Sequence, residues 1–224
     1  MSSRKDFLAA SAASALTGAG MAAASPAQAA GPVILDEAAF KARIASRAQH
    51  RQAIGAARVN DAAALQFAVN TLNGFMNGWN EPASNVQIAV VLFGSSVTLG
   101  LDDTAWREHR LAELVRRFQG DWLTPDAASA NPWSHTAANA GPRGDRSIPA
   151  LLARGVKIFL CNTALGEVSN RIVAAGYGGG VTDPFAIQAH LRERALPGCD
   201  IVPAGISSVA VLQENGYSYF SAAL

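Results

Sequence analysis

The sequence predicts an α/β fold in which a mostly parallel sheet is covered by helices on both faces. Two segments, residues 86–93 and 156–160, are almost continuously apolar, which is typical of strands that are covered on both sides. Helical patterns stand before, between and after these segments, and strands that alternate with helices indicate a parallel sheet. The chain has 224 residues, enough for one domain of roughly 100–200 residues with appendages.

The composition excludes several other classes of protein. Hydrophobic residues make up 50% of the chain, charged residues 16%, and the net charge is +1, whereas disordered chains combine low hydrophobicity with high net charge. Nucleic-acid-binding domains carry a clear basic excess, so we expect no nucleic-acid partner. The two cysteines cannot form a disulfide scaffold and fit no four-ligand zinc spacing.

Residues 1–29 are predicted to be an export signal. Arg4 and Lys5 precede a long uncharged stretch that ends in the small-x-small sequence Ala27-Gln28-Ala29, the pattern of a cleaved signal peptide. The opening resembles a twin-arginine signal in which Lys5 replaces the second arginine, and a general secretory signal is the alternative. The stretch is too weakly hydrophobic for a membrane span. We therefore expect a periplasmic protein that begins at Ala30 and keeps no membrane span.

The elements of the first half follow from the spacing of apolar residues and from residues that start helices. Residues 30–47 form a lead-in with a surface helix, and residues 49–59 are a weakly marked first strand. Asn60-Asp61 is the expected N-cap of the next helix, and another helix begins near Asp103 or Thr104. The first of these two helices has one apolar stripe at three- and four-residue spacing: Leu65, Ala68, Val69, Leu72, Phe75, Met76 and Trp79. The second has its inner face at Leu111, Leu114, Val115 and Phe118.

The second half continues the alternation after a long irregular segment, residues 120–147. This segment carries Trp122 and Trp133 in polar surroundings, which makes them better candidates for an interface or a pocket lid than Trp106, which is expected in the core. Asp183-Pro184 is a good helix start, and Gly216 is an expected helix end. The expected helices are residues 148–154, 165–175, 184–196 and 207–215, and the expected strands are residues 199–202 and, at a sheet edge, 217–220.

Cys161 is the leading candidate for chemistry. It stands where the strand 156–160 ends and a helix follows, and ligands of open α/β sheets gather outside the carboxyl ends of the strands. The helix N-terminus favours the nucleophilic thiolate, although a cysteine there is equally a small buried hydrophobe. Cys199 begins its strand, so it lies at the opposite edge, roughly 16 Å away, and a disulfide needs Cα atoms within about 7 Å.

Other polar motifs are weak. His50, His109, His135 and His190 have no metal-ligand spacing, so surface or capping roles are expected, and neither a metal nor a cofactor is predicted. The loop Gly176–Gly180 precedes a helix start. It is either a backbone cradle for an anion or a flexible turn, since it lacks the spacing of the known phosphate-binding motifs.

Two segments around Cys161 resemble the DsrE/DsrF-like family. Residues 155–163 contain the strand that ends in Cys161-Asn-Thr, and residues 197–219 contain Val-Pro-Ala-Gly-Ile and Leu-Gln-Glu-Asn-Gly-Tyr-Ser-Tyr. The resemblance spans roughly residues 48–221 and identifies residues 48–224 as a DsrE-like domain. It implies a flavodoxin-like three-layer sandwich and homo-oligomers, often trimers or hexamers. In its sulfur-relay members, which are cytoplasmic, the cysteine matching Cys161 carries a persulfide.

Two functions remain open at this stage. The first is a sulfur carrier or sulfurtransferase in which Cys161 accepts sulfane sulfur from a donor and passes it to an acceptor, neither of which the sequence identifies. The second is a non-catalytic periplasmic binding or assembly protein in which Cys161 is only packed. In either case we expect self-association, with a trimer favoured, because Tyr217, Tyr219 and Phe220 are residue types enriched at interface cores.

Overall fold

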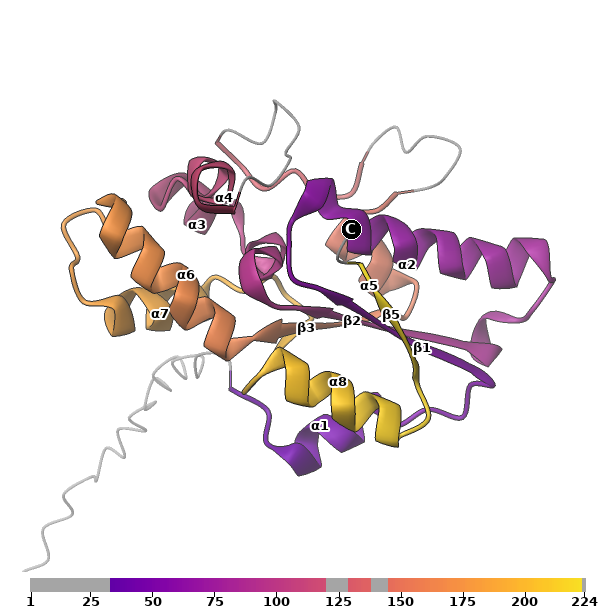
Figure 1. Cartoon of the computed structure of the whole chain (residues 1–224). Helices are drawn as coiled ribbons and strands as arrows, with labels where there is room; N and C mark the ends of the chain where they lie inside the picture. The colour runs from indigo at the N-terminus through magenta and orange to yellow at the C-terminus, as the bar shows by residue number, and fades with distance from the viewer. Residues whose placement is uncertain (1–32, 120–128, 138–144, 223–224) are drawn as a thin grey trace, which may run out of the picture. The chain divides into compact units, whose positions relative to one another are not determined.

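The sheet of five parallel strands is the centre of the computed structural model, which describes residues 33–119, 129–137 and 145–222 (Figure 1). Its strands pair in the order β4-β3-β2-β1-β5, and each neighbouring pair is parallel. The predicted fold class is therefore confirmed, including the weakly marked first strand. The strand bounds are β1 His50–Ala56, β2 Val86–Leu92, β3 Lys157–Cys161, β4 Cys199–Val202 and β5 Ser218–Ser221.

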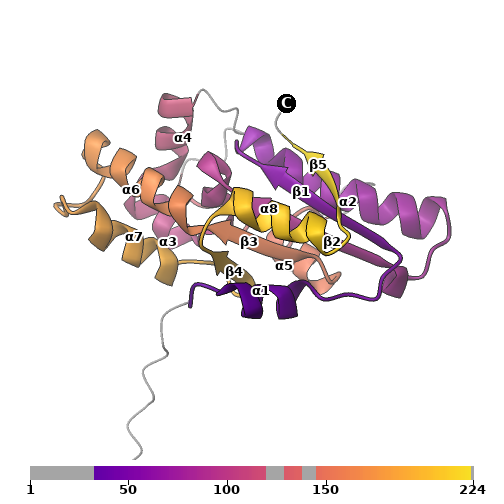
Figure 2. The same cartoon turned by 60° about the horizontal axis from the view of Figure 1, so that its bottom comes forward.

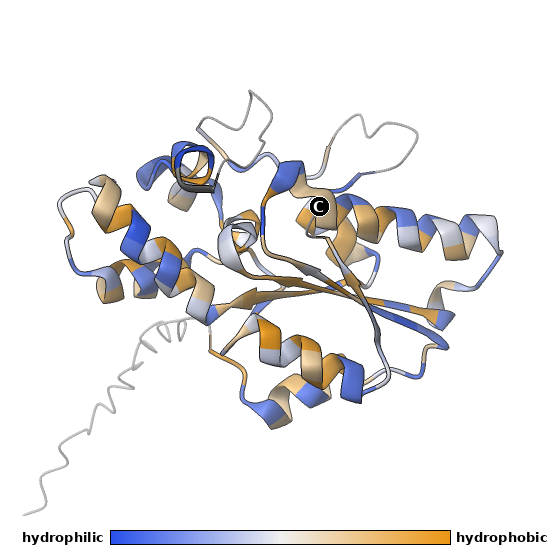
Figure 3. Ribbon diagram, viewed as in Figure 1, coloured by the Kyte–Doolittle hydropathy of each residue, from blue (hydrophilic) through white to orange (hydrophobic). Residues whose placement is uncertain are grey.

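Helices cover the sheet on both faces, which gives the expected three layers (Figures 1 and 2). The helices α1 and α8 lie on one face, and α2, α5 and α6 contribute to the other. Figure 3 shows the central part of the sheet as mostly apolar, with polar residues on the outer sides of the helices. The helix bounds are α1 Glu37–Ile44, α2 Ala63–Asn73, α3 Asp103–Glu108, α4 Leu111–Gln119, α5 Ile148–Ala153, α6 Asn162–Ala175, α7 Pro184–Glu193 and α8 Gly205–Glu214.

The continuous apolar runs of β2 and β3 fill two separate cores. Successive side chains of a strand point to opposite faces. Val90 and Leu160 accordingly belong to the larger core, whereas Val91 and Phe159 belong to the smaller core beneath α1 and α8. In the smaller core the Phe159 ring meets the Phe40 ring edge to face, with centroids 4.9 Å apart. Both strands are therefore apolar at every inward position, as their sequence predicts.

The strand order creates a switch point between β3 and β4. From β1 to β4 the chain advances along the sheet with its connecting helices on one face, and it then returns through α8 on the other face to place β5 beside β1. Right-handed crossovers require this change of face when the direction reverses. As a result β3 leads into α6 on one face and the neighbouring β4 leads into α8 on the other. In such sheets ligands bind outside the strand ends at this kind of point.

The expected N-cap at Asn60-Asp61 is wrong. Asn60, Asp61 and Ala62 have positive φ angles of 39°, 47° and 58°, and α2 begins only at Ala63. The Asp61 carboxylate accepts a hydrogen bond from Arg146 at 2.8 Å, so it holds a distant segment and does not cap the helix. The expected apolar stripe of α2 is buried as far as Leu72, but Trp79 is 72% exposed.

The single helix expected after Asp103 is in fact two helices. Asp102 caps α3 by accepting the Ala105 N–H at 2.9 Å, and α3 ends at Glu108. Arg110 then adopts a left-handed conformation with φ 49°, a region that a non-glycine residue seldom occupies, and α4 begins at Leu111. This break turns the chain at His109. The side chain of Phe118, expected on the inner face, lies outside the described residues.

Trp133 is a core residue, and its expected place at an interface or lid is wrong. Its side chain is 3% exposed and meets the Trp106 ring with centroids 6.2 Å apart. Asn131 fixes this segment, because its Nδ2 donates to the carbonyls of Leu99 and Leu101 at 2.7 and 2.6 Å while its Oδ1 accepts the Trp133 N–H. The other tryptophan of this segment, Trp122, lies outside the described residues.

Among the helices that the structure describes, none is long and apolar enough to cross a membrane.

Candidate functional site

Cys161 lies where the sequence places it, at the carboxyl end of β3. It is the last residue of the strand and the N-cap of α6, a helix of 14 residues. Its Sγ accepts the backbone N–H of Ala164 at 3.3 Å, so the sulfur faces the positive end of the helix dipole, which stabilises negative charge. The residue is only 5% exposed, and a reagent therefore reaches the sulfur only after neighbouring groups move.

Residues 155–163 and 197–219 meet at this point. Thr163 donates both its backbone N–H and its hydroxyl to the carbonyl of Pro203, at 3.2 and 3.1 Å. Gly205 packs directly on Cys161: a Cβ there would lie 3.3 Å from the Cys161 Cβ and 2.9 Å from the Phe93 Cβ. Only a residue without a side chain fits this contact, so the start of α8 depends on glycine to close over the cysteine.

Cys199 lies in a different environment. In the register of β3 and β4 it stands opposite Ile158, whereas Cys161 stands opposite Val202, and both thiols are free. Burial, with a smaller contribution from Asp200, raises the pKa of Cys199 to about 12. The thiolate is the reactive form of cysteine, so the position of Cys199 is that of a packed, inert side chain.

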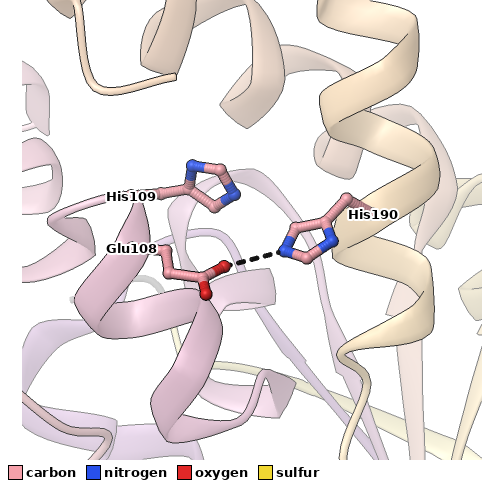
Figure 4. A group of neighbouring side chains, drawn as sticks. All are labelled: Glu108, His109 and His190. Atoms are coloured by element: carbon pink, nitrogen blue, oxygen red, sulfur yellow. Dashed lines mark hydrogen bonds and ion pairs between the residues drawn. The ribbon is translucent and has the colours of Figure 1, made fainter. Parts of the chain in front are cut away.

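A second group of polar residues lines a pocket that the sequence does not reveal. The cavity has a volume of about 420 Å³ and lies between the end of α3, the glycine loop after α6, and α7. Glu108 and His109 come from the end of α3 and His190 comes from α7 (Figure 4). The remaining lining residues are Gly178, Gly179, Val181, Ala186 and Ile187.

The hydrogen bonds of this group define its chemistry. His109 Nδ1 lies 3.2 Å from the carbonyl oxygen of Tyr177. A carbonyl only accepts, so Nδ1 carries the proton and Nε2 of the neutral ring holds a lone pair. His109 is 6% exposed and, within the described structure, its Nε2 has no hydrogen-bond partner. Burial lowers the pKa of His109, with a smaller lowering from His190, and therefore favours the neutral ring. His190 Nε2 lies 3.1 Å from Glu108 Oε2.

The surface role expected for the histidines is wrong for His109, which is buried and lies beside His190. His109 and His190 are 81 residues apart in the chain, yet their ring centroids are 5.4 Å apart. They meet because two backbone hydrogen bonds join the segment just before α3 to the segment just after α7. The N–H of Asp102 donates to the carbonyl of Arg194, and the N–H of Leu196 donates to the carbonyl of Gly100. No spacing in the sequence signals this packing.

The other two histidines and the glycine loop have plain structural roles. His50 stacks on Phe75 with centroids 4.3 Å apart, and His135 bonds to Asp103 at 2.8 Å. Gly176 ends α6 with a positive φ of 72°. Two later glycines of the loop, Gly178 and Gly179, form part of the pocket wall.

Comparison with known proteins gives one structural likeness. No family model and no curated protein matches this chain. The solved structure of a protein of unknown function from Methanobacterium thermoautotrophicum is similar to it, with 15% sequence identity and a TM-score of 0.41. The match covers 77% of this chain and 98% of that chain.

Proposed function

We propose that this protein is an exported, DsrE-like sulfur carrier in which Cys161 holds the transferred sulfur as a persulfide. The observation that carries the proposal is the placement of Cys161 Sγ at the N-terminus of α6 and at the switch point between β3 and β4. Family resemblance supports it, because both resembling segments contribute to the surroundings of this one sulfur. The proposed chemistry needs no cofactor.

The transfer step is balanced without an external oxidant. The Cys161 thiolate attacks the outer sulfur of a persulfide or polysulfide donor, a new S–S bond forms, and the S–S bond of the donor breaks. The electron pair of the broken bond leaves on the donor thiolate, which takes up a proton from solvent. The attacking sulfur lies at the N-terminus of α6, the end of a helix at which negative charge is favoured. Access requires neighbouring groups to move, since Cys161 is 5% exposed.

The experiment compares the two cysteines in the folded protein. After treatment with polysulfide, mass spectrometry of the intact protein and its peptides is expected to show one added sulfur atom on Cys161, removable by a reductant. Cys199→Ser is the matched control and keeps the gain, whereas Cys161→Ser folds and shows none. Iodoacetamide is expected to alkylate Cys161 faster than Cys199, whose pKa is raised to about 12.

The outcome that contradicts the carrier is slow, equal alkylation of both cysteines with no added sulfur. That result favours the alternative function, a periplasmic binding or assembly protein in which Cys161 is only packed. A pocket of about 420 Å³ away from the cysteine is the observation that favours this alternative, because binding proteins need such a cavity.

Export and self-association are parts of the same proposal. The expected signal, residues 1–29, lies outside the described residues, and N-terminal sequencing of periplasmic protein is expected to begin at Ala30; a sequence that begins at Met1 contradicts export. Tyr219 and Phe220 are 41% and 40% exposed on the edge strand β5, which supports self-association, whereas Tyr217 is buried and cannot contribute. Light scattering is expected to give a trimer, and the mass of a single chain at micromolar concentration contradicts self-association.

A further inference from the structure

We propose that Glu108, His109 and His190 bind a divalent transition-metal ion of the zinc class. Among the described residues these three side chains offer one ligand atom each, and the three atoms lie within 4.8 Å of one another. Two imidazoles with one carboxylate form a known donor set for zinc in sites that keep a coordination position open. The proposal is independent of the sulfur chemistry at Cys161.

His109 is the anchor of the proposed site. Its Nδ1 donates to the Tyr177 carbonyl, and metal-ligating histidines almost always make such a second bond, which fixes the tautomer and the orientation of the ring. The free Nε2 lone pair is buried and without a partner in the described structure. Buried polar atoms are paired in the large majority of cases. A metal ion in the pocket would give this nitrogen its missing partner.

The remaining two ligands have the freedom to close around an ion. Tetrahedral coordination at about 2.0–2.1 Å from zinc to nitrogen or oxygen places neighbouring ligand atoms about 3.4 Å apart, compared with the 4.8 Å limit observed here. The side chains of His190 and Glu108 are 31% and 48% exposed. Small rotations of these two side chains therefore bring the ligand atoms to the required separation while His109 stays fixed. Their mutual contact at 3.1 Å already brings two donors together.

A comparison within the chain separates this group from an ordinary ion pair. His135 and Asp103 also form a histidine–carboxylate contact, at 2.8 Å, with the His135 side chain 76% exposed. No third metal-ligating side chain joins that pair among the described residues. At Glu108 and His190 the third ligand is present, and the neighbouring cavity of about 420 Å³ leaves room for a water molecule or a small ligand at the fourth position.

The experiment titrates metal-free full-length protein with Zn²⁺ by calorimetry, and with Co²⁺ by visible absorption. Wild type is expected to bind one ion per chain, and Co²⁺ is expected to give the intense bands of a tetrahedral site. Glu108→Gln and His190→Gln are expected to weaken binding by about 100-fold or more, since loss of even an outer-shell partner costs 10–100-fold. His135→Gln is the matched control and keeps the wild-type affinity.

Folding is checked separately from binding. Both variant positions are partly exposed, so circular dichroism and the melting temperature of metal-free protein are expected to match wild type, while the rise in melting temperature on adding Zn²⁺ is lost. Binding that persists unchanged in both variants overturns the proposal, as does equal weakening by His135→Gln. Zinc bound only through Cys161, shown by loss in Cys161→Ser and retention in His190→Gln, also overturns it.

Discussion

Replacing Asn131 with aspartate tests how the segment before α5 is held in the core. The Asn131 side chain is 1% exposed, and its Nδ2 donates to the carbonyls of Leu99 and Leu101 at 2.7 and 2.6 Å. Aspartate has nearly the same shape but no donor, so both carbonyls lose their partner and face a carboxylate. An unsatisfied buried group costs about 1–3 kcal/mol, so two of them reduce the free energy of unfolding by roughly 2–6 kcal/mol. Domains typically have only about 5–15 kcal/mol in total.

Urea denaturation at neutral pH measures this loss as a shift of the midpoint at constant slope. Asn215→Asp is the matched control: Asn215 also donates its Nδ2 to a carbonyl, that of Val211, but it is exposed, and surface substitutions change stability by no more than about 0.5 kcal/mol. A loss of less than about 1 kcal/mol in Asn131→Asp would refute the reasoning, because it would mean that water reaches these carbonyls.

Other predictions concern the smaller core and the surroundings of Cys161. Tyr217→Phe removes the hydroxyl that donates to the Ile44 carbonyl at 2.7 Å, which is expected to cost about 1–2 kcal/mol in urea denaturation. Burial raises the pKa of Tyr217 to about 12, so its contribution to stability is expected to fall from about pH 10 to pH 12, as the unfolded chain loses its proton first. Tyr217→Phe removes this contribution and leaves the separate alkaline fall that comes from Cys199. Gly205→Ala forces a Cβ to 2.9 Å from the Phe93 Cβ and is expected to lower stability by about 1–3 kcal/mol. Gly74→Ala, where an added Cβ meets nothing within 4 Å, is expected to raise stability by about 0.5–1 kcal/mol; an equal loss in both variants would contradict the clash.

Much of the fold was predictable because its signals are local. The runs that became β2 and β3 are apolar at every buried position, and only Gln87 and Lys157, which are partly exposed, are polar. Asp183 accepts the Phe185 N–H and Pro184 opens α7, as their types predict. The failure at Asn60 and Asp61 has a tertiary cause, because the bond from Arg146 to Asp61 spans 85 residues and outweighs the local preference for capping.

The two candidate sites differ in how far the sequence reveals them. Cys161 was found because its place depends only on where one strand ends and one helix begins. The pairing of His109 with His190 depends on a break after α3 and on the packing of α3 near α7, neither of which has a signal in residue spacing. For a similar reason the sequence does not predict the burial of Trp133. Its neighbours in the sequence are polar, but the Asn131 side chain forms hydrogen bonds with the nearby backbone and so allows the ring to be buried.

The position of β5 has a consequence for folding kinetics. The outer edge of β1 is covered only through the pairing of residues 52–55 with residues 218–221, which joins two segments more than 160 residues apart. Until residues 218–221 have been synthesised, β1 presents an unpaired edge, and such edges are templates for pairing with other chains. Contacts of long sequence separation also form slowly. Closure of this edge therefore comes late in folding, and until then the edge of β1 is open to pairing with other chains.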